Sequence, residues 1–224
     1  MELKELINAN FKSLDSSESN CYFDKDRVYK IFKSNIDIES RLEVIKKILN
    51  NNIQGCPQLH EFIYDCDRIV GYSMEYYKKA IPFSSKMRFE FRRKKCLELL
   101  YLYIQLKDRY DLCYYDFHNK NVYINKSSIL LLDIDSCLMG KSVNENETDK
   151  YLIDYILSTI YNVSFFDYEI YYTQEESKII RNELYKFNDS TIKKIEDLEL
   201  FVKSSTKTDI KKILKKLPYN IKNH

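Results

Sequence analysis

The sequence predicts an α+β fold in which a β-rich N-terminal part precedes a helical C-terminal part. Alternating and β-branched runs, which are typical of strands, are concentrated before residue 78. Beyond that point, long segments repeat apolar residues at helical spacing. The 224 residues can bury one substantial core or two small lobes, and no Gly/Ser-rich or Pro-rich linker separates the two parts. We therefore expect one continuous domain.

The N-terminal part contains three predicted strands and a helix. Residues 27–33 (RVYKIFK) alternate in the manner of a strand, and residues 39–49 (ESRLEVIKKIL) place apolar side chains at helical spacing. Residues 59–67 and 68–77 then form two runs joined by a polar turn, DCD. This order predicts a strand, a helix and a pair of strands.

The C-terminal part consists mainly of predicted helices. Residues 86–110 form a long apolar stripe, which predicts a core helix. Lysines are frequent from residue 203 to residue 222, and we interpret this run as a solvated helix face. Four further helices are predicted at residues 147–162, 175–187, 190–202 and 207–217.

Residues 114–135, between two of these helices, carry polar side chains at the ends of short strands. Strands are predicted at 122–124 and 129–132, with Asp116 and Asn121 before this hairpin and Asp133 after it. In phosphoryl transfer, the attacking hydroxyl needs a proton acceptor, and magnesium on the phosphates needs carboxylate and amide oxygens. The pattern predicts that Asp116 is the base and that Asn121 and Asp133 bind the metal.

The residues just described resemble motifs of the protein kinase superfamily. YYDFHNKN (114–121) resembles the HRDxxxxN catalytic loop, and LLLDIDS (130–136) resembles the strand that ends in DFG. His118 gives the form DxHxxN, which is more similar to aminoglycoside phosphotransferase-like kinases and to other compact, atypical bacterial or phage kinases. The resemblance implies that His118 lies near the transferring phosphate, where it either donates a hydrogen bond or packs in the loop.

This resemblance extends over residues 11–162 and implies a bilobal protein kinase-like fold. Residues 1–77 would form a small β-rich N-lobe and the hinge. Residues 78–224 would form a trimmed helical C-lobe within the same single domain. Asp149 would support the backbone of the catalytic loop, and Asp135 would be a further carboxylate near the metal or a turn residue at the strand end.

The resemblance also implies how the N-lobe binds ATP. Lys30 lies where kinases place the lysine that holds the α- and β-phosphates, whereas the nearby Lys33 is expected to be solvated. Glu43 is the expected ion-pair partner of Lys30, and Glu39, one turn earlier, is the alternative.

Two further parts of the N-lobe would contact the nucleotide. MEYY resembles the hinge between kinase lobes, where the backbone of Glu75, Tyr76 and Tyr77 would meet adenine. The first hairpin has no glycine-rich loop, because SLDSSESNCYF contains no glycine. Ser16 and Ser17 could form a looser lid, since a non-glycine residue in a left-handed conformation costs about 1–2 kcal/mol. We expect weakened ATP binding, with the chemistry retained.

The function predicted is an ATP- and Mg²⁺-dependent kinase that transfers the γ-phosphate to a hydroxyl of a protein Ser, Thr or Tyr or of a small molecule. Retention of both metal-ligand positions favours an active enzyme, because the metal neutralises charge on the transferring group. The alternatives are a pseudokinase that binds a nucleotide or a partner, and an AMP transferase on the same fold.

Composition restricts the remaining classes. The formal net charge of +2 gives no reason to expect binding to nucleic acid or to a membrane. The six cysteines include no CxxC pair, which favours reduced core residues of a cytoplasmic protein and gives no indication of zinc. The N-terminus is too polar for a signal peptide, and no apolar run reaches membrane-spanning length.

Overall fold

The computed structural model describes residues 1–9, 11–140, 145–161 and 195–216. Contacts within the chain divide it into two compact units. The first unit contains Met1–Ile81 and Tyr123–Cys137, and the second contains Pro82–Val122 and Leu138–His224. The division into lobes at residues 77 and 78 stays a prediction.

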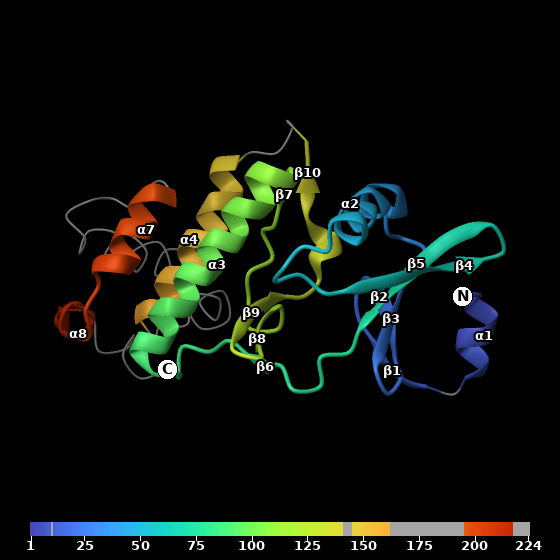
Figure 1. Cartoon of the computed structure of the whole chain (residues 1–224), viewed down its shortest axis with the longest axis horizontal. Helices are drawn as coiled ribbons and strands as arrows, with labels where there is room; N and C mark the ends of the chain where they lie inside the picture. The colour runs from blue at the N-terminus through green and yellow to red at the C-terminus, as the bar shows by residue number, and fades with distance from the viewer. Residues whose placement is uncertain (10, 141–144, 162–194, 217–224) are drawn as a thin grey trace. The chain divides into compact units, whose positions relative to one another are not determined.

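The first unit is built on an antiparallel five-stranded sheet, in which the strands follow the order β1-β2-β3-β5-β4 (Figure 1). The short helix α1 contacts β4, and α2 contacts β4 and the 3₁₀ helix η1. The elements are α1 (Leu3–Asn8), β1 (Lys12–Asp15), β2 (Ser19–Phe23), β3 (Arg27–Phe32), α2 (Ile38–Asn51), β4 (Leu59–Asp65) and β5 (Arg68–Glu75).

Strand β3 is the buried centre of this sheet, and it carries Lys30 among apolar neighbours. Its partner β5 places Gly71 opposite Ile31. A Cβ atom at Gly71 would lie 2.1 Å from the backbone oxygen of Lys30, so only glycine permits this close approach of the two strands. The position of Lys30 therefore depends on the sequence of β5 as well as on its own strand.

Helix α2 confirms the helix expected at residues 39–49. Asp37 caps its first turn by accepting a hydrogen bond from the backbone N–H of Glu39 at 3.2 Å. The helix buries Val44, Ile45 and Ile48. It stops at Asn52, which adopts a left-handed conformation with φ 44°.

The hairpin predicted after the polar loop is present as β8 (Val122–Asn125) and β9 (Ser128–Leu131). Lys126 and Ser127 turn the chain with positive φ values of 47° and 71°, as a tight primed turn requires. The sheet order is β6-β8-β9, with β6 at Ile81–Pro82, and η1 follows β9 at Ile134–Ser136.

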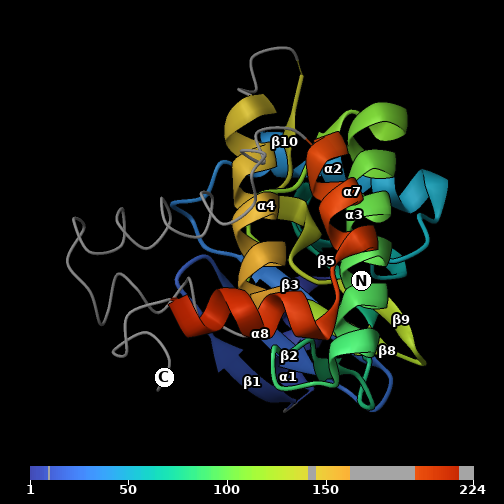
Figure 2. The ribbon, with the colours of Figure 1, turned by 90° about the vertical axis from the view of Figure 1, so that its left-hand side faces the viewer.

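Helix α3 is the central element of the second unit. It contacts α4 and α7, and α8 contacts α4 (Figure 2). Strands β7 and β10 pair as a short antiparallel ribbon. The bounds are α3 (Phe89–Tyr110), β7 (Leu112–Cys113), β10 (Leu138–Met139), α4 (Glu145–Tyr161), α7 (Ile195–Ser204) and α8 (Lys207–Lys216).

These helices confirm most of the C-terminal prediction. The long stripe at 86–110 is a core helix, because α3 fully buries Cys96, Leu99, Leu100, Tyr103 and Leu106. The helices predicted at 147–162 and 207–217 correspond to α4 and α8, and α7 overlaps the end of 190–202. The segment 175–187 lies outside the described residues.

Cysteine burial agrees with the sequence expectation in four of six positions. Cys56, Cys96, Cys113 and Cys137 are buried, whereas Cys66 is exposed and Cys21 is half-buried. All six carry free thiols. Within the described ranges, no helix combines the length and the apolar character needed to cross a membrane.

Candidate active site

The strongest charged contact in the first unit joins β3 to the segment after β9. The side chain of Lys30 is only 6% exposed, and its amine donates to Oδ1 of Asp133. It also donates to both carboxylate oxygens of Asp135, at 2.9 and 3.1 Å. Lys30 and Asp133, which the sequence predicted in separate roles, are therefore in direct contact.

Asp135 is the most buried member of this cluster, with no exposed side-chain surface. It accepts a hydrogen bond from the hydroxyl of Tyr72 on β5 at 2.6 Å. Arg41 of α2 approaches its other oxygen at 3.6 Å, beyond hydrogen-bonding distance. Two residues after Asp133 in sequence, Asp135 is thus a buried charge surrounded by donors.

The cluster controls the protonation of Lys30 and Tyr72. Burial alone would lower the pKa of Lys30, but the carboxylates of Asp135 and Asp133 outweigh it and raise that pKa above its usual value. Burial, together with the negative charge of Asp135, raises the pKa of Tyr72. The lysine is therefore a cation and the tyrosine a neutral donor at neutral pH.

The structure does not bring Glu43, the partner of Lys30 expected on α2, to that lysine. Glu43 is exposed, and Lys30 pairs instead with Asp133 and Asp135. The reason is the rotation of the helix: turning Val44, Ile45 and Ile48 inward directs Glu43 to the solvent. Glu39, the alternative, is exposed as well.

Arg41 is the residue of α2 that approaches the cluster, and no sequence pattern indicated this role. One guanidinium nitrogen lies 3.1 Å from the carboxylate of Glu18, in the turn between β1 and β2. Another faces Asp135. Arg41 therefore links the first hairpin to the charges around Lys30, and its side chain is 16% exposed.

Lys33, the nearby lysine considered beside Lys30, contacts the first hairpin, formed by β1 and β2. It lies 2.7 Å from the carboxylate of Asp15 and also donates to the backbone oxygen of Ser16. Its side chain is 32% exposed, in contrast to that of Lys30. Its contacts with the hairpin favour a structural role for Lys33.

Hydrogen bonds between Ser16 and Ser19 close the turn of the first hairpin. The hydroxyl of Ser16 donates to the backbone oxygen of Ser19 at 2.9 Å and accepts from the backbone N–H of Ser19 at 3.1 Å. Ser17 is exposed at the tip. Both serines are exposed, but the hydroxyl of Ser16 is engaged within the turn.

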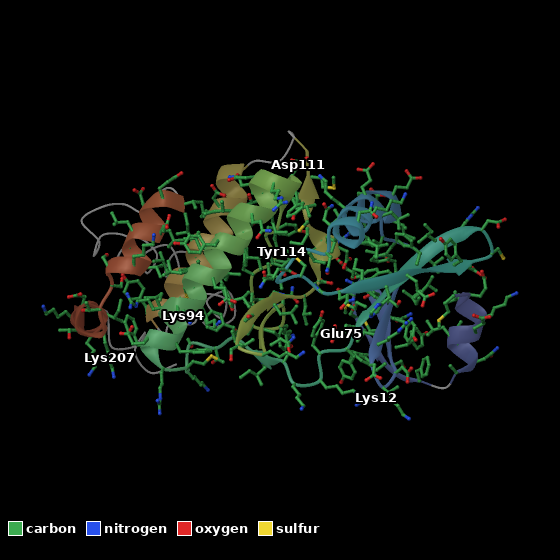
Figure 3. All side chains as sticks on the ribbon, in the orientation of Figure 1. Lys12, Glu75, Lys94, Asp111, Tyr114 and Lys207 are labelled. Carbon is green, nitrogen blue, oxygen red and sulfur yellow. The ribbon has the colours of Figure 1, made fainter. Side chains whose placement is uncertain are left out.

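Backbone donors at the predicted hinge are partly occupied. The N–H of Glu75, labelled in Figure 3, donates to the oxygen of Gln58 at 2.9 Å, and that of Tyr76 donates to the oxygen of Asp26 at 2.8 Å. No hydrogen bond from the N–H of Tyr77 is found among the described residues. Tyr77 is therefore the hinge residue whose amide could serve a ligand.

In the second unit, aromatic packing anchors the predicted catalytic loop. Phe117, which is 1% exposed, packs edge-on against Tyr114, with ring centroids 4.9 Å apart. It also contacts Tyr103 of α3 and Tyr155 of α4. Tyr114, labelled in Figure 3, donates its hydroxyl to the backbone oxygen of Asp116 at 3.1 Å. Aromatic burial thus fixes the position of this loop.

The polar residues of this loop bind one another. Asn121 donates its amide to Oδ2 of Asp116 at 2.7 Å, and Nε2 of His118 lies 3.3 Å from Oδ1. Nδ1 of His118 accepts from the backbone N–H of Lys120 at 3.1 Å, which assigns the proton to Nε2. The structure therefore brings Asp116, His118 and Asn121 together, with Asp116 38% exposed.

The predicted metal ligands have the oxygen atoms that magnesium requires. Because Asn121 directs its amide nitrogen to Asp116, its amide oxygen has no donor among the described residues. Asp133 uses Oδ1 for Lys30 and is 32% exposed. The described residues contain no group of three or more His, Cys, Asp or Glu that could hold a metal, so other ligands would come from phosphate and water. Asn121 belongs to the second unit and Asp133 to the first.

Asp149 joins two helices. It accepts from the hydroxyl of Tyr103 at 2.7 Å and from the amine of Lys107 at 3.1 Å, both on α3. These contacts connect the start of α4 to α3. The expected support of the catalytic loop is therefore indirect, through Tyr103, whose ring packs against Phe117.

Comparison with known proteins identifies the fold. No protein-family model matches the chain, and no curated protein matches it either. Among solved structures, it is similar to the kinase PK-1 of Cydia pomonella granulovirus, with a TM-score of 0.61 at 12% identity. The match covers 93% of this chain and 95% of that chain. The fold is therefore kinase-like, with a β-rich N-terminal region and a helical C-terminal region, and the closer likeness to aminoglycoside phosphotransferase-like kinases stays a prediction.

Proposed function

We propose that this chain, with its kinase-like fold, is an ATP- and Mg²⁺-dependent phosphotransferase that acts on a hydroxyl group. The observation that carries the proposal is the buried contact between Lys30 and Asp133, which lie 103 residues apart in sequence. A buried amine paired with a half-exposed carboxylate offers both a phosphate-binding cation and a metal-binding anion. Kinase chemistry requires these two groups.

Lys30 would bind the α- and β-phosphates of ATP. Its second partner, Asp135, is fully buried and also bound by Tyr72, so it would keep Lys30 in place when phosphate oxygens take over the contact with Asp133. In this role Asp135 replaces the glutamate that kinases supply from a helix. The exchange would free the carboxylate of Asp133.

Asp133 and Asn121 would supply a carboxylate and an amide oxygen to Mg²⁺. The bound ion would neutralise charge on the phosphates during transfer. Asn121 is oriented for this by its hydrogen bond to Asp116 at 2.7 Å.

Asp116 would accept the proton of the attacking hydroxyl. Asn121 and His118 hold its two oxygens, so the carboxylate has a defined direction. His118, with its proton on Nε2, could donate to the transferring phosphate after leaving Asp116. The N–H of Tyr77 would contact adenine, and Ser17 would form the looser lid.

The test is incubation of the protein with γ-labelled ATP and Mg²⁺, alone and with a lysate as the source of acceptors. We expect label transfer that falls about 100-fold or more in Asp116→Asn, because a positioned base contributes about 10²–10⁴ to the rate. Asp133→Asn should lose at least as much. Asp108→Asn, an exposed carboxylate on α3, is the matched control and should transfer label normally.

The same experiment separates the two alternatives. Transfer of label from α-labelled ATP would assign AMP transfer to the protein. ATP binding without transfer to any component would assign a pseudokinase. Equal transfer by Asp116→Asn and the unaltered protein would refute the proposed base.

A further inference from the structure

A second candidate site lies in the helical unit, apart from every residue proposed to bind ATP. A pocket of about 330 Å³ lies among the residues before α3, the first turns of α3, the end of α4 and the start of α8. Pockets of about 300–1,000 Å³ are the usual size for small-molecule ligands. Asp116, His118 and Asn121 are not among its lining residues.

The lining of this pocket is basic around an apolar interior. It includes no acidic residue, and it combines cations on three segments with apolar side chains. None of the four exposed cations forms an ion pair within the described part of the chain. The cations are Lys86, Arg88, Arg92, Lys207 and Lys211, and the apolar residues are Met87, Phe89 and Ile210.

Arg92 is the independent evidence for an anion. It is only 7% exposed, and its Nη1 donates to the backbone oxygens of Ser85 and Thr159. Its Nε is buried without a hydrogen-bond partner, and no carboxylate pairs with it among the described residues. Burial lowers the pKa of Arg92, which reflects the cost of keeping this charge from water. A buried, uncompensated guanidinium favours a negative ligand beside it.

The start of α3 adds to the positive field. Residues 85–89 line the pocket and lead into this 22-residue helix, whose first residues have no side-chain cap. The N-terminal end of a helix carries a partial positive charge and free backbone N–H groups. Both the helix and the side chains therefore favour an anion in the same place.

We propose that this pocket binds a small phosphate monoester whose ester group is aromatic or apolar. The dianionic phosphate matches the excess of cations better than a carboxylate, which carries one charge, and Arg binds phosphate in a forked geometry. Phe89, Met87 and Ile210 would contact the apolar group. This inference does not depend on the proposed kinase activity.

The test is calorimetric titration of the full chain with phenyl phosphate, inorganic phosphate and phenol, in the absence of nucleotide. We expect saturable binding of phenyl phosphate, at least tenfold tighter than that of either fragment. Absence of saturable binding would overturn the proposal. Binding of inorganic phosphate or of phenol as tightly as phenyl phosphate would also overturn it. Only the cations or only the apolar side chains of the pocket would then contribute to binding.

Variants locate the binding. Lys86→Gln with Lys211→Gln should weaken phenyl phosphate about fivefold to tenfold, because both lysines are exposed and line the pocket. Lys79→Gln with Lys94→Gln removes the same charge outside the lining and should change affinity less than twofold; Lys94 and Lys207 are labelled in Figure 3. Arg92→Met should lose at least tenfold. If Arg92→Met does not fold, the two lysine double variants provide the test. Equal affinity of both double variants for phenyl phosphate would refute binding in this pocket.

Discussion

Lys30 of the first unit and Arg92 of the second unit are both buried cations, with 5% and 7% of their surface exposed, yet their partners differ. Lys30 contacts the carboxylates of Asp133 and Asp135. Among the residues that the structure describes, Arg92 contacts two backbone oxygens and the ring of Phe89, and its Nε has no hydrogen-bond partner. Within that part of the chain, carboxylates balance the charge of Lys30 but not that of Arg92.

The difference indicates two ways in which a buried cation could bind a phosphate. At Lys30, a carboxylate occupies the place of the ligand. A phosphate would replace Asp133 as a partner of the amine, while Asp135 would remain bound to it. No acid pairs with Arg92 in the described ranges, so a ligand would supply the negative charge directly. Burial of a cation without a counter-charge is costly, and this cost favours anion binding at Arg92.

The largest expected effect comes from removing the internal counter-charge. Asp135→Asn should lower the free energy of unfolding by about 3–5 kcal/mol, because breaking a buried pair leaves Lys30 with a partly uncompensated charge. Chemical denaturation measures it. Asp26→Asn is the control, since Asp26 is 91% exposed and pairs with Lys78 at only 3.5 Å. A loss below about 1 kcal/mol in Asp135→Asn would show that Asp133 alone compensates Lys30.

Arg92→Met should cost less, about 1–3 kcal/mol, although it removes an equally buried cation. Two backbone oxygens, of Ser85 and Thr159, lose a donor, but no carboxylate is left behind. Arg93→Met on the same helix is the matched control, because its side chain is 33% exposed, and it should cost about 0–1 kcal/mol. If Arg92→Met were as costly as Asp135→Asn, the contrast between the two cations would fail.

Cys56 extends the comparison to a buried group with no charged partner. Burial raises the pKa of its thiol from 9.0 to about 12. The unfolded chain therefore loses this proton first as pH rises, so stability present below pH 9 is lost between pH 9 and pH 12. At pH 10 the loss from this thiol should be about 1 kcal/mol.

Denaturation under reducing conditions at pH 7 and pH 10 measures this loss. Cys56→Ala should show a smaller difference between the two pH values than the unaltered protein does. Cys66→Ala, which removes an exposed thiol, should show the same difference as the unaltered protein. A pH dependence unchanged in Cys56→Ala would contradict the assignment to this thiol.

The smallest expected effect is at Glu43. Because this side chain is exposed and Lys30 has other acids, Glu43→Gln should change stability by less than about 0.5 kcal/mol and phosphate transfer by less than twofold. Denaturation and the labelled-ATP assay measure both. A tenfold loss of transfer would return Glu43 to the role that the sequence suggested, and would make Asp135 a structural residue only.

Much of the local structure follows from short stretches of sequence. RVYKIF is a buried strand because its residues are β-branched or aromatic around a single lysine, and ESRLEVIKKIL is helical because its apolar residues recur at helical spacing. The sequence predicts Asp116 and Asn121 together, and the four residues of loop between them suffice to bring their side chains to 2.7 Å.

Contacts between distant segments could not be read in this way. The acid partner of Lys30 depends on which face α2 turns inward, and a helix that buries Val44, Ile45 and Ile48 points Glu43 outward and brings Arg41 to Asp135. The burial of Arg92 depends on the backbone of Ser85 and Thr159, which no local sequence pattern indicates. Periodicity shows which residues share one face of a helix. It does not show what that face contacts, because its neighbours come from other parts of the chain.

By itself, then, the sequence determined the order of strands and helices, the polar loop and the need of a buried Lys30 for an acid. Propensity, spacing and charge act over a few residues, and these are visible in a linear chain. The tertiary structure alone decided that the acids are Asp133 and Asp135 and that Arg41 joins them. It also decided that Arg92 is buried without an acid among the described residues. Burial and charge pairing between remote segments are settled only when the packed chain excludes water from them.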